Sequence, residues 1–343
     1  MEYLLEVKGL RTSFFTHVGE IKAIRGVDFS MEKGEIIGIV GESGSGKSVT
    51  SLSIMQLLQY PGRVIGGEIN FKGKNILDCS KQEMRKIRGN EISMIFQDPM
   101  TSLNPLYTVG KQIVENILEH TELNKADAKE RAIEMLRIVG IPAPEERYRN
   151  YPHEFSGGMR QRAMIAMALS CDPSLLIADE PTTALDVTIQ IQILDLIKQL
   201  NQKLGMSTIL ITHDLGVVAN MCRKILVMYA GVILEEGSAH DIFYRPKHPY
   251  TMGLLKSIPK VSGSQKERLL PIPGSPPDLL NPPTGCPFCN RCEFARNLCA
   301  QEMPPYFKEG QHRAMCWLLH EDAPKIEGYE RLKGGVGNGK AVG

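Results

Sequence analysis

The sequence predicts an α/β fold in which a parallel β-sheet is covered by helices, and three observations lead to this prediction. Short, wholly apolar segments are typical of buried strands, helical spacing recurs between them, and one apolar strand runs into a glycine-rich loop followed by a helix. Parallel strands need a crossover, which is usually a helix, so this alternation indicates a parallel sheet. The 343 residues leave room for one large domain and one smaller domain.

The composition excludes several classes of protein. Hydrophobic residues make up 42% and charged residues 23% of the chain, which argues against disordered and fibrous proteins. The formal charge is +1, so no global field marks a nucleic-acid-binding protein. No run approaches the ~18 to 20 apolar residues that span a bilayer, and the start M-E-Y-L-L-E-V-K lacks the regions of a signal peptide. We therefore expect a soluble, cytoplasmic chain whose anion sites are local.

The N-terminal part begins with short strands. The segments L-L-E-V-K, I-K-A-I and V-D-F-S-M are divided by turn-like residues around Gly19, and Gly34 leads into the fully apolar strand 36–40. That strand ends at Gly41, a Gly/Ser loop follows, and from Lys47 the pattern has helical spacing. A strand, a glycine loop and a helix in this order are typical of the start of an α/β domain.

The middle of the chain combines a helical insertion with further strands. Residues 76–165 are largely polar and helical in pattern, including a helix over 127–139 that stops at Gly140. A second helix is expected over 187–204, because apolar residues recur there at helical spacing between Asp186 as N-cap and Gly205 as C-cap. Three more apolar strands are expected at 175–178, 208–212 and 225–228.

The composition shifts after about residue 257. The segment P-I-P-G-S-P-P-D-L-L-N-P-P-T-G excludes regular helix or strand and indicates a linker or an extended arm. The final G-G-V-G-N-G-K-A-V-G is typical of a flexible tail. We expect a nucleotide-binding domain over 1–257 with its helical subdomain at about 99–164, a proline-rich and cysteine-bearing extension over 258–325, and a flexible tail over 326–343.

The loop G-E-S-G-S-G-K-S, Gly41 to Ser48, matches the phosphate-binding pattern G-x-x-x-x-G-K-[ST] between a strand and a helix. Glycines let backbone N–H groups turn towards phosphate oxygens, and the helix N-terminus adds a partial positive charge. We expect Lys47 to reach the terminal phosphates and Ser48 to bind Mg²⁺; the plainer alternative is a glycine turn that only caps a helix. The expected nucleotide contacts in this loop are Gly41, Ser43, Gly44, Ser45, Gly46, Lys47, Ser48 and Val49.

The strand L-L-I-A ends in Asp179 and Glu180, which places two carboxylates at the carboxyl edge of the sheet, where α/β proteins bind ligands. Sites with a phosphate loop usually have a second motif, an acidic residue that holds Mg²⁺, and Asp179 would do this through a water molecule. Glu180 would orient and polarise the attacking water. The alternative is that the two acids only cap the next helix. The presence of a phosphate loop in the same chain favours the role in nucleotide binding over this alternative.

A second anion-binding helix start lies between these two motifs. Ser156, Gly157 and Gly158 open an apolar helix and bring no lysine of their own. With S-G-G-M-R-Q in this place, the chain resembles the ATP-binding subunits of ATP-binding-cassette (ABC) transporters. The resemblance implies an ABC-type nucleotide-binding domain with an antiparallel β subdomain, in which this signature closes on ATP held by the phosphate loop of another subunit.

The resemblance also implies roles for four single residues. Gln97 resembles the glutamine that contacts Mg²⁺ and the attacking water, and His213 resembles the histidine that contacts the γ-phosphate. Asp186 resembles the aspartate that faces the partner subunit, which is compatible with its role as a helix cap. Phe14 resembles the aromatic residue that stacks on adenine, although Phe15 is adjacent and burial is the commoner fate of a phenylalanine.

Further segments narrow the resemblance to the D-type ATP-binding subunits of oligopeptide and dipeptide importers: M-T-S-L-N-P, M-R-Q-R in the signature, H-P-Y-T, P-I-P-G-S-P-P and the cysteines. This implies ATP hydrolysis that powers the import of dipeptides or oligopeptides across the cytoplasmic membrane, with the chain bound peripherally at the cytoplasmic face. The implied partners are an F-type ATPase subunit, or a second copy of this chain, two membrane permease subunits that contact the loop after Gln97 and the helical subdomain, and indirectly an extracellular peptide-binding protein. No nucleic-acid partner is implied.

The cysteines of the extension form a possible ligand set. The chain has eight cysteines, and a cluster in a reducing cytosol favours a metal site over disulfides. The family pattern uses Cys286, Cys292, Cys299 and Cys316, so Cys289 is a departure or a substitute ligand. C-x2-C-x2-C resembles the start of an iron–sulfur ligand set. We expect a structural [4Fe–4S] cluster, with Zn²⁺ as one alternative and free or disulfide-bonded thiols as another.

Two rival functions remain to be weighed. One is a soluble ABC ATPase that acts on nucleic acid or ribosomes; such proteins usually carry tandem cassettes or a long coiled-coil insertion, and this chain has one phosphate loop and a short insertion. The other is a metal-binding interaction protein with a vestigial ATPase core. The presence of Lys47, Glu180, Gln97 and His213 argues against it.

Overall fold

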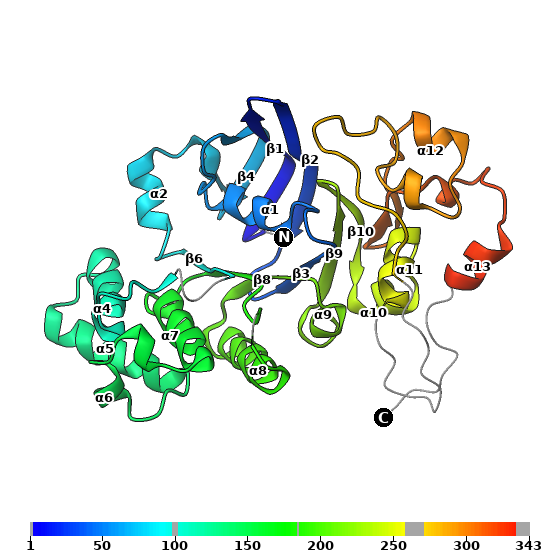
Figure 1. Ribbon diagram of the computed structural model, residues 1–343. Coiled ribbons are helices and arrows are strands. Elements are labelled where there is room, and N and C mark those ends of the chain that lie inside the picture. Colours follow the sequence, from blue (N-terminus) through cyan, green and yellow to red (C-terminus); the bar gives the residue numbers. More distant parts are fainter. Residues whose placement is uncertain (1–2, 98–101, 184, 258–270, 334–343) are drawn as a thin grey trace, which may run out of the picture. The chain divides into compact units, whose positions relative to one another are not determined.

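The computed structural model describes residues 3–97, 102–183, 185–257 and 271–333, and its elements are labelled in Figure 1. The expected segment M-T-S-L-N-P lies in part outside the described residues. The chain divides into two compact units, which are described separately. The first comprises residues 1–5, 31–36 and 70–211, and the second comprises residues 6–30, 37–69 and 212–343.

The first unit contains three parallel strands, β6 (Ile92–Ile95), β7 (Leu175–Asp179) and β8 (Ser207–Thr212). β7 lies between the other two, with Ile92 opposite Leu175 and Leu175 opposite Ser207. All residues of β6, β7 and β8 are buried, which explains why they are continuous apolar runs rather than alternating ones. Helix α8 (Val187–Leu204) connects β7 to β8, with Asp186 as N-cap and Gly205 as C-cap, as the sequence predicts.

The rest of the first unit is mainly helical, and this confirms the predicted insertion. Its largest helices are α4 (Val109–His120), α5 (Lys125–Ile138) and α7 (Gly157–Leu169), which pack on one another. Their buried faces carry the apolar residues, such as Ile113, Ile117 and Leu136. The smaller elements are β5 (Lys74–Asn75), η1 (Ile76–Asp78), α2 (Lys81–Ile87), α6 (Pro144–Arg147) and η2 (Pro152–Glu154).

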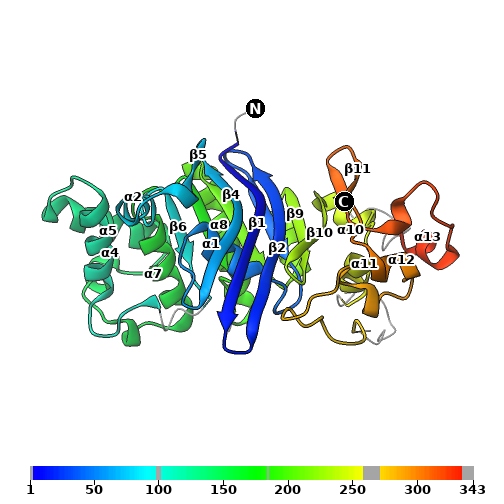
Figure 2. The same cartoon turned by 90° about the horizontal axis from the view of Figure 1, so that it is seen from above.

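The second unit contains the predicted antiparallel strands. β1 (Leu5–Thr16) lies between β2 (Gly19–Met31) and β4 (Gly62–Phe71), and Figure 2 shows β1 and β2 side by side. Since only two residues connect β1 to β2, these neighbours must run antiparallel. A further sheet in this unit has the order β11-β12-β10-β9-β3, where β3 (Ile36–Val40) and β9 (Lys224–Tyr229) are parallel and β10 (Val232–Ser238) is antiparallel to β9.

The extension belongs to this second unit and contributes strands to its sheet, which the sequence does not predict. β12 (His312–Ala314) pairs antiparallel with β10, and β11 (Phe307–Glu309) pairs with β12. Helix α13 (Glu327–Lys333) occupies part of the segment expected as a flexible tail. The other helical elements of this unit are α1 (Lys47–Ile54), α9 (Leu215–Met221), α10 (Ala239–Tyr244), α11 (Pro249–Lys256), η3 (Cys289–Arg291), α12 (Asn297–Gln301) and η4 (Trp317–Leu319).

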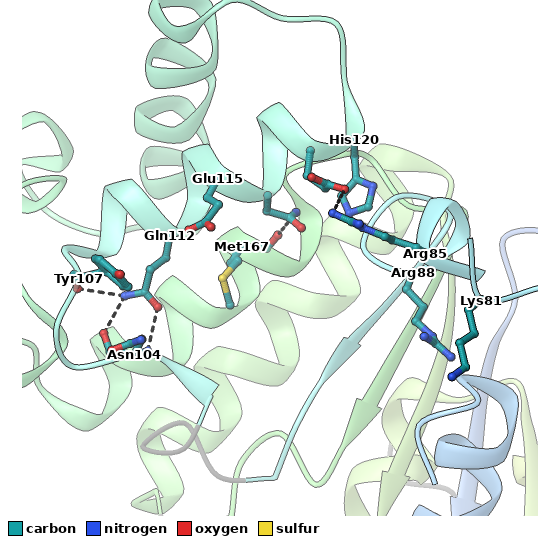
Figure 3. Close-up of a pocket in the computed structure, with 11 residues that line it drawn as sticks. Lys81, Arg85, Arg88, Asn104, Tyr107, Gln112, Glu115, His120 and Met167 are labelled. Atoms are coloured by element: carbon teal, nitrogen blue, oxygen red, sulfur yellow. Dashed lines mark hydrogen bonds and ion pairs between the residues drawn. The ribbon is translucent and has the colours of Figure 1, made fainter. Parts of the chain in front are cut away.

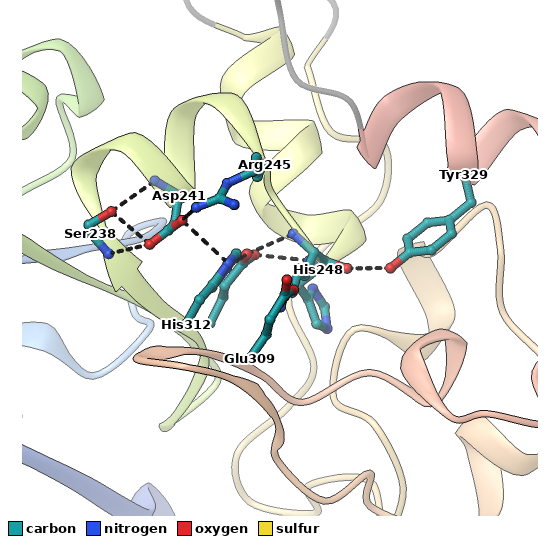
Figure 4. A network of polar contacts seen from close by, with 9 residues as sticks. Ser238, Asp241, Arg245, His248, Glu309, His312 and Tyr329 are labelled. Carbon is teal, nitrogen blue, oxygen red and sulfur yellow. Dashed lines mark hydrogen bonds and ion pairs between the residues drawn. The ribbon is translucent and has the colours of Figure 1, made fainter.

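Buried polar contacts join the extension to the core of its unit (Figure 4). Glu235 of β10 is fully buried and accepts hydrogen bonds from the backbone N–H groups of Lys247 and His248, at 2.7 and 2.9 Å. His312 Nε2 lies 2.7 Å from the same carboxylate. Tyr329 donates its hydroxyl to the carbonyl of Lys247 at 2.7 Å. A buried carboxylate needs such partners, so the contact of His312 with Glu235 ties β12 to the core. The hydrogen bond of Tyr329 ties α13 to the core in the same way.

Within the described residues, no helix is both long and apolar enough to cross a bilayer.

Candidate functional site

The phosphate loop connects β3 to α1 in the second unit. Three of its glycines, Gly41, Gly44 and Gly46, have positive φ angles of 155, 76 and 105°. At Gly41 a Cβ atom would lie 2.1 Å from the carbonyl oxygen of Met228, so no other residue fits there without movement. Lys47 is 6% exposed, and its Nζ donates to the carbonyl oxygens of Gly41 and Glu42 at 2.8 and 2.9 Å. The loop therefore has the glycine-rich turn that a phosphate cradle requires, with its lysine folded back onto it.

The acid pair ends β7 in the first unit. Asp179 is 6% exposed, while the backbone of Glu180 is in the left-handed region with φ 47°. The Glu180 carboxylate accepts hydrogen bonds from Gln97 Nε2 at 3.1 Å and from Thr183 Oγ1 at 3.0 Å. The predicted pair Gln97 and Glu180 is thus brought together, although 83 residues separate the two in the sequence. A carboxylate oriented by two side-chain donors at a strand end suits the polarisation of a water molecule.

The signature lies at the start of α7, also in the first unit. Ser156 is the N-cap, and its Oγ accepts from the N–H of Met159 at 3.3 Å. Ser156 and Gly157 are exposed, so this helix N-terminus is open to solvent. A Cβ at Gly158 would lie 2.9 Å from Ile189 Cγ2, which explains the second glycine through close packing against α8. The open N–H groups of this helix start can bind an anion.

The remaining predicted residues, His213 and Phe14, lie in the second unit. His213 follows β8 and is exposed, in the second unit. Phe14 is half-buried, and a Cβ at Gly62 would lie 2.6 Å from its ring. Phe15 is 37% exposed and carries the Arg63 guanidinium 4.1 Å from its ring centroid. The choice of Phe14 as the adenine-stacking residue therefore stays a prediction.

Five cysteines of the extension line one pocket in the second unit: Cys286, Cys289, Cys292, Cys299 and Cys316. Burial raises the pKa of the Cys286 thiol to about 12 and that of the Cys292 thiol to about 11. His248 lines the same pocket and is 1% exposed. Its Nδ1 accepts from the N–H of Tyr250 at 3.0 Å, so the neutral ring carries its proton on Nε2, which has no partner among the described residues.

The expected metal site is not supported by the side-chain positions. In the part of the chain that is described, no group of three or more His, Cys, Asp or Glu residues is arranged to hold a metal ion. The pocket nevertheless gathers the whole predicted ligand set, including Cys289. In the sequence, His248 belongs to the segment H-P-Y-T, and no spacing rule connects it to the cysteines.

An open groove of about 760 Å³ lies in the first unit, between α2 and the helical insertion (Figure 3). Arg85 of α2 forms an ion pair with Glu119 of α4 at 2.7 Å. On the opposite side, Gln112 of α4 holds the segment before this helix, because its side chain bonds the backbone of Asn104 and Tyr107 at 2.9 to 3.0 Å. Leu106 in that segment is 79% exposed. Most residues that line the groove are therefore polar or charged, and an exposed apolar residue lies beside it.

Two family models match the chain. The one described as "ABC transporter" matches residues 24–183, and the one described as "Oligopeptide/dipeptide transporter, C-terminal region" matches residues 234–299. The first includes the phosphate loop, the signature and the acid pair. The second includes the first four cysteines of the pocket and ends before Cys316.

Close relatives cover nearly the whole chain. An oligopeptide transport ATP-binding protein of Bacillus subtilis is 57% identical over 332 residues, which are 96% of this chain and 93% of that protein. A dipeptide transport ATP-binding protein of Lactococcus lactis is 55% identical over 95% of this chain and 93% of that protein. An oligopeptide transport ATP-binding protein of Escherichia coli is 52% identical over 91% of this chain and 92% of that protein.

Among solved structures, the chain is similar to a dimeric ATP-binding cassette in a post-hydrolysis state, bound to ADP and phosphate. The TM-score is 0.62 at 28% identity, and the match covers 68% of this chain and 98% of that cassette.

Proposed function

The chain belongs to the ABC transporter family as an ATP-binding subunit, and from this premise we propose that it hydrolyses ATP to power the import of dipeptides or oligopeptides across the cytoplasmic membrane. The observation that carries the proposal is the phosphate loop, whose glycines and buried Lys47 form a cradle for phosphates within a chain at least half identical to peptide-transport ATP-binding proteins. The rival function on nucleic acid or ribosomes has no observation in its favour.

The residues of the ATP site have the following roles in this proposal. Lys47 and the loop N–H groups bind the phosphates, and the groups that would hold Mg²⁺ are the Ser48 hydroxyl, the Asp179 carboxylate and the Gln97 amide. These donors are hard oxygens, which suit Mg²⁺, and the ion when bound would neutralise charge on the phosphates. Glu180 accepts the proton of the attacking water, and Gln97 orients that carboxylate. His213 contacts the γ-phosphate, and Phe14 stacks on adenine.

The signature of one chain completes the ATP site of another. Ser156, Gly157 and Gly158 offer an exposed helix N-terminus without a lysine, so they would contact the γ-phosphate of ATP held by a second subunit. We propose an F-type ATPase subunit as this partner, with a homodimer as the alternative. ATP would favour the closed pair, and hydrolysis would release it.

The membrane subunits would dock on the groove of the helical insertion and on the loop after Gln97. Polar and charged residues line the groove, their aliphatic parts are exposed in it, and Leu106 is exposed beside it, which suits a short amphipathic helix of a permease subunit. Through two such permease subunits the chain would be a peripheral protein at the cytoplasmic face of the membrane. An extracellular peptide-binding protein would deliver the substrate to them.

Transport and ATP hydrolysis should be measured on the chain assembled with its companion ATPase and permease subunits in vesicles. We expect ATP-dependent uptake of a labelled peptide, together with phosphate release. The Lys47→Ala variant should lose both, because the lysine that binds the terminal phosphates is gone. Peptide uptake without ATP, or stable association of the purified chain with RNA in place of membrane subunits, would contradict the proposal.

We also propose that the cysteine pocket holds a structural [4Fe–4S] cluster, with Zn²⁺ as the alternative. Cys286, Cys292, Cys299 and Cys316 would be the ligands, with Cys289 as a substitute, and the group when bound would contribute folding energy. Thiolates are soft ligands that suit iron–sulfur clusters and zinc. The unpartnered Nε2–H of His248 in this pocket is a donor that a sulfide or thiolate would satisfy.

The two candidate groups differ in composition, so chemical analysis distinguishes them. Tetrahedral zinc, with Zn–S bonds of about 2.3 Å, requires four sulfurs about 3.8 Å apart. The cysteines line one pocket, but their described side chains are not arranged to hold a metal ion, so their positions favour neither group. Anaerobic purification followed by iron, sulfide and zinc analysis tests this. We expect iron and sulfide in the full chain and in the Cys79→Ser control but not in Cys292→Ser; one zinc and no iron would overturn the cluster.

A further inference from the structure

Arg291 of the extension reaches the phosphate loop. Its Nη1 and Nη2 donate to the two carboxylate oxygens of Glu42, at 2.5 and 2.9 Å. Its Nε donates to the carbonyl of Pro273 at 2.9 Å, and the remaining N–H groups reach Tyr229 Oη at 3.2 Å and the carbonyl of Ile272 at 3.1 Å. All five donors of the guanidinium therefore have a partner, and the side chain is only 4% exposed.

Glu42 is the residue of the phosphate loop that follows Gly41, and its backbone is held as well. The Glu42 N–H donates to Tyr250 Oη at 2.8 Å. The Glu42 carbonyl oxygen accepts from Lys47 Nζ at 2.9 Å and from the N–H of Ser45 at 3.2 Å. The residue that contacts the extension thus also carries hydrogen bonds that set the shape of the loop.

Aromatic rings fix the plane of the guanidinium. Arg291 Cζ lies 5.7 Å from the ring centroid of Tyr229 and 5.9 Å from that of Phe288. The Tyr229 and Tyr250 rings are 4.6 Å apart, and Phe288 packs edge-on against Tyr229 at 5.5 Å. Residues of β9, α11 and the extension therefore hold Arg291 in one orientation towards the loop.

The charge of Glu42 makes this contact important for anion binding. A free carboxylate beside a phosphate cradle would repel a triphosphate, and it could also accept the backbone N–H groups meant for phosphate oxygens. A bidentate pair with arginine neutralises the carboxylate and fixes its direction. Lysine would not replace it, because an ammonium is a point charge with three donors and cannot pair with both oxygens in the same fork geometry.

We propose that Arg291 is a positioning residue of the ATP site, which neutralises and orients Glu42 and so holds the phosphate loop in the conformation that binds ATP. Arg291 contacts no reacting atom and acts through Glu42. The proposal rests on the proposed function, since it requires that the phosphate loop binds ATP. It makes the cysteine-bearing extension part of the nucleotide site of its own chain.

Equilibrium binding of Mg²⁺–ATP to the full chain tests the proposal. We expect Arg291→Ala to raise the dissociation constant on the order of tenfold, the loss of about one charge-assisted bidentate pair. Arg291→Lys should not restore affinity. The double variant Glu42→Gln with Arg291→Ala should bind ATP more tightly than Arg291→Ala alone, because the unpaired negative charge beside the phosphates is gone.

Arg313→Ala is the matched control. Arg313 also ties the extension to the core, since its Nε donates to Glu236 Oε2 of β10 at 2.7 Å, but it contacts no residue of the phosphate loop among its recorded partners. Its removal should lower the midpoint of thermal unfolding and leave ATP affinity unchanged. The comparison of the two variants distinguishes an effect on the position of the phosphate loop from a general loss of contacts between the extension and the core.

The outcomes distinguish the inference from the function on which it rests. Arg291→Ala binding ATP within about twofold of the wild type would overturn the inference, and so would an equal loss of affinity in Arg291→Ala and Arg313→Ala. If Arg291→Ala does not fold, Arg291→Lys is compared with Arg313→Ala in the same way. Failure of the wild type to bind ATP, or equal binding by Lys47→Ala, would overturn the proposed function itself.

Discussion

Glu180 combines two features that are typical of functional residues. Its backbone lies in the left-handed region, which costs a non-glycine residue of the order of 1 kcal/mol or more. Its carboxylate is held by Gln97 and Thr183, and its N–H donates to the carbonyl of Ile211 at 2.9 Å. A strained residue whose side chain is oriented by its neighbours is well suited to direct one oxygen at a water molecule.

Glu180→Gln should leave ATP binding intact and reduce turnover. The amide has nearly the same shape and keeps one oxygen that Gln97 or Thr183 can bond, but it cannot accept a proton. We expect phosphate release to fall by about 10² to 10⁴ fold, the usual contribution of a general base. ATP binding and phosphate release are measured on the same preparation. Glu145→Gln, in an exposed glutamate of α6, is the control, and wild-type turnover in Glu180→Gln would remove Glu180 from the mechanism.

Single cysteines also differ in their surroundings. Cys222 is 5% exposed outside the pocket, and burial raises its pKa to about 12. Such a thiol is inert at neutral pH, because the thiolate is the reactive form. Of the three cysteines that precede the extension, this one packs close to Gly38 of β3, where a Cβ would lie 3.0 Å from its sulfur. Cys222 therefore has a packing role and offers no ligand to the pocket.

At the level of elements, β10 is the strand that receives the extension. Its sequence V-I-L-E-E-G-S contains two adjacent acids, yet Glu235 is fully buried and Glu236 is 8% exposed. Each acid has a partner from β12, His312 for Glu235 and Arg313 for Glu236. The neighbouring strand β12 thus supplies the partners that allow two acidic residues to be buried in β10.

Glu235→Ala should detach the extension from the core. The substitution leaves the N–H groups of Lys247 and His248 and the ring of His312 without their common acceptor. Unsatisfied buried donors cost about 1 to 3 kcal/mol each, so we expect a loss of about 3 kcal/mol in the free energy of unfolding. Denaturant titration measures it.

Glu309→Ala is the control for this variant. Glu309 also contacts Lys247, at 2.7 Å, but its side chain is 75% exposed, and exposed ion pairs contribute little to stability. We expect no measurable change in the control. Equal stability of the two variants would show that the buried network around Glu235 does not hold the extension.

On the scale of the whole molecule, the residues proposed for the ATP site are divided between the two compact units. The phosphate loop and His213 lie in one compact unit, and the acid pair, Gln97 and the signature lie in the other. The signature presents an open helix N-terminus with no phosphate-binding lysine of its own. A second ATPase subunit is the partner that would use it.

Glu180→Gln should therefore form an ATP-dependent dimer. When hydrolysis is blocked, ATP stays bound and the two subunits do not separate. Mg²⁺–ATP should therefore convert the variant into a dimer with its companion ATPase or with a second copy. Sedimentation velocity measures the mass with ATP and with ADP. Adding Lys47→Ala to the variant should abolish the dimer. A variant that stays monomeric with ATP, alone and with the companion, would argue against a shared site.

The sequence alone identified the fold class and the motifs from which the ATP site is proposed, since short motifs determine local structure. A glycine loop before a helix, acids at the end of an apolar strand, and Asp186 and Gly205 at the ends of α8 depend on neighbouring residues and their φ angles. The helical insertion was likewise predicted from its spacing. The family resemblance added the partners and the substrate class.

Tertiary structure alone decided how the extension is used. Expected as a proline-rich arm with a cysteine cluster, it also adds β11 and β12 to a sheet and brings Arg291 to Glu42, 249 residues away in the sequence. It places His248 beside the cysteines as well. No local pattern encodes such contacts, because an ion pair between distant residues depends on how the strands pair and on which side chains become buried together. The motifs were therefore evident from the sequence, and the link between the cysteine segment and the phosphate loop was not.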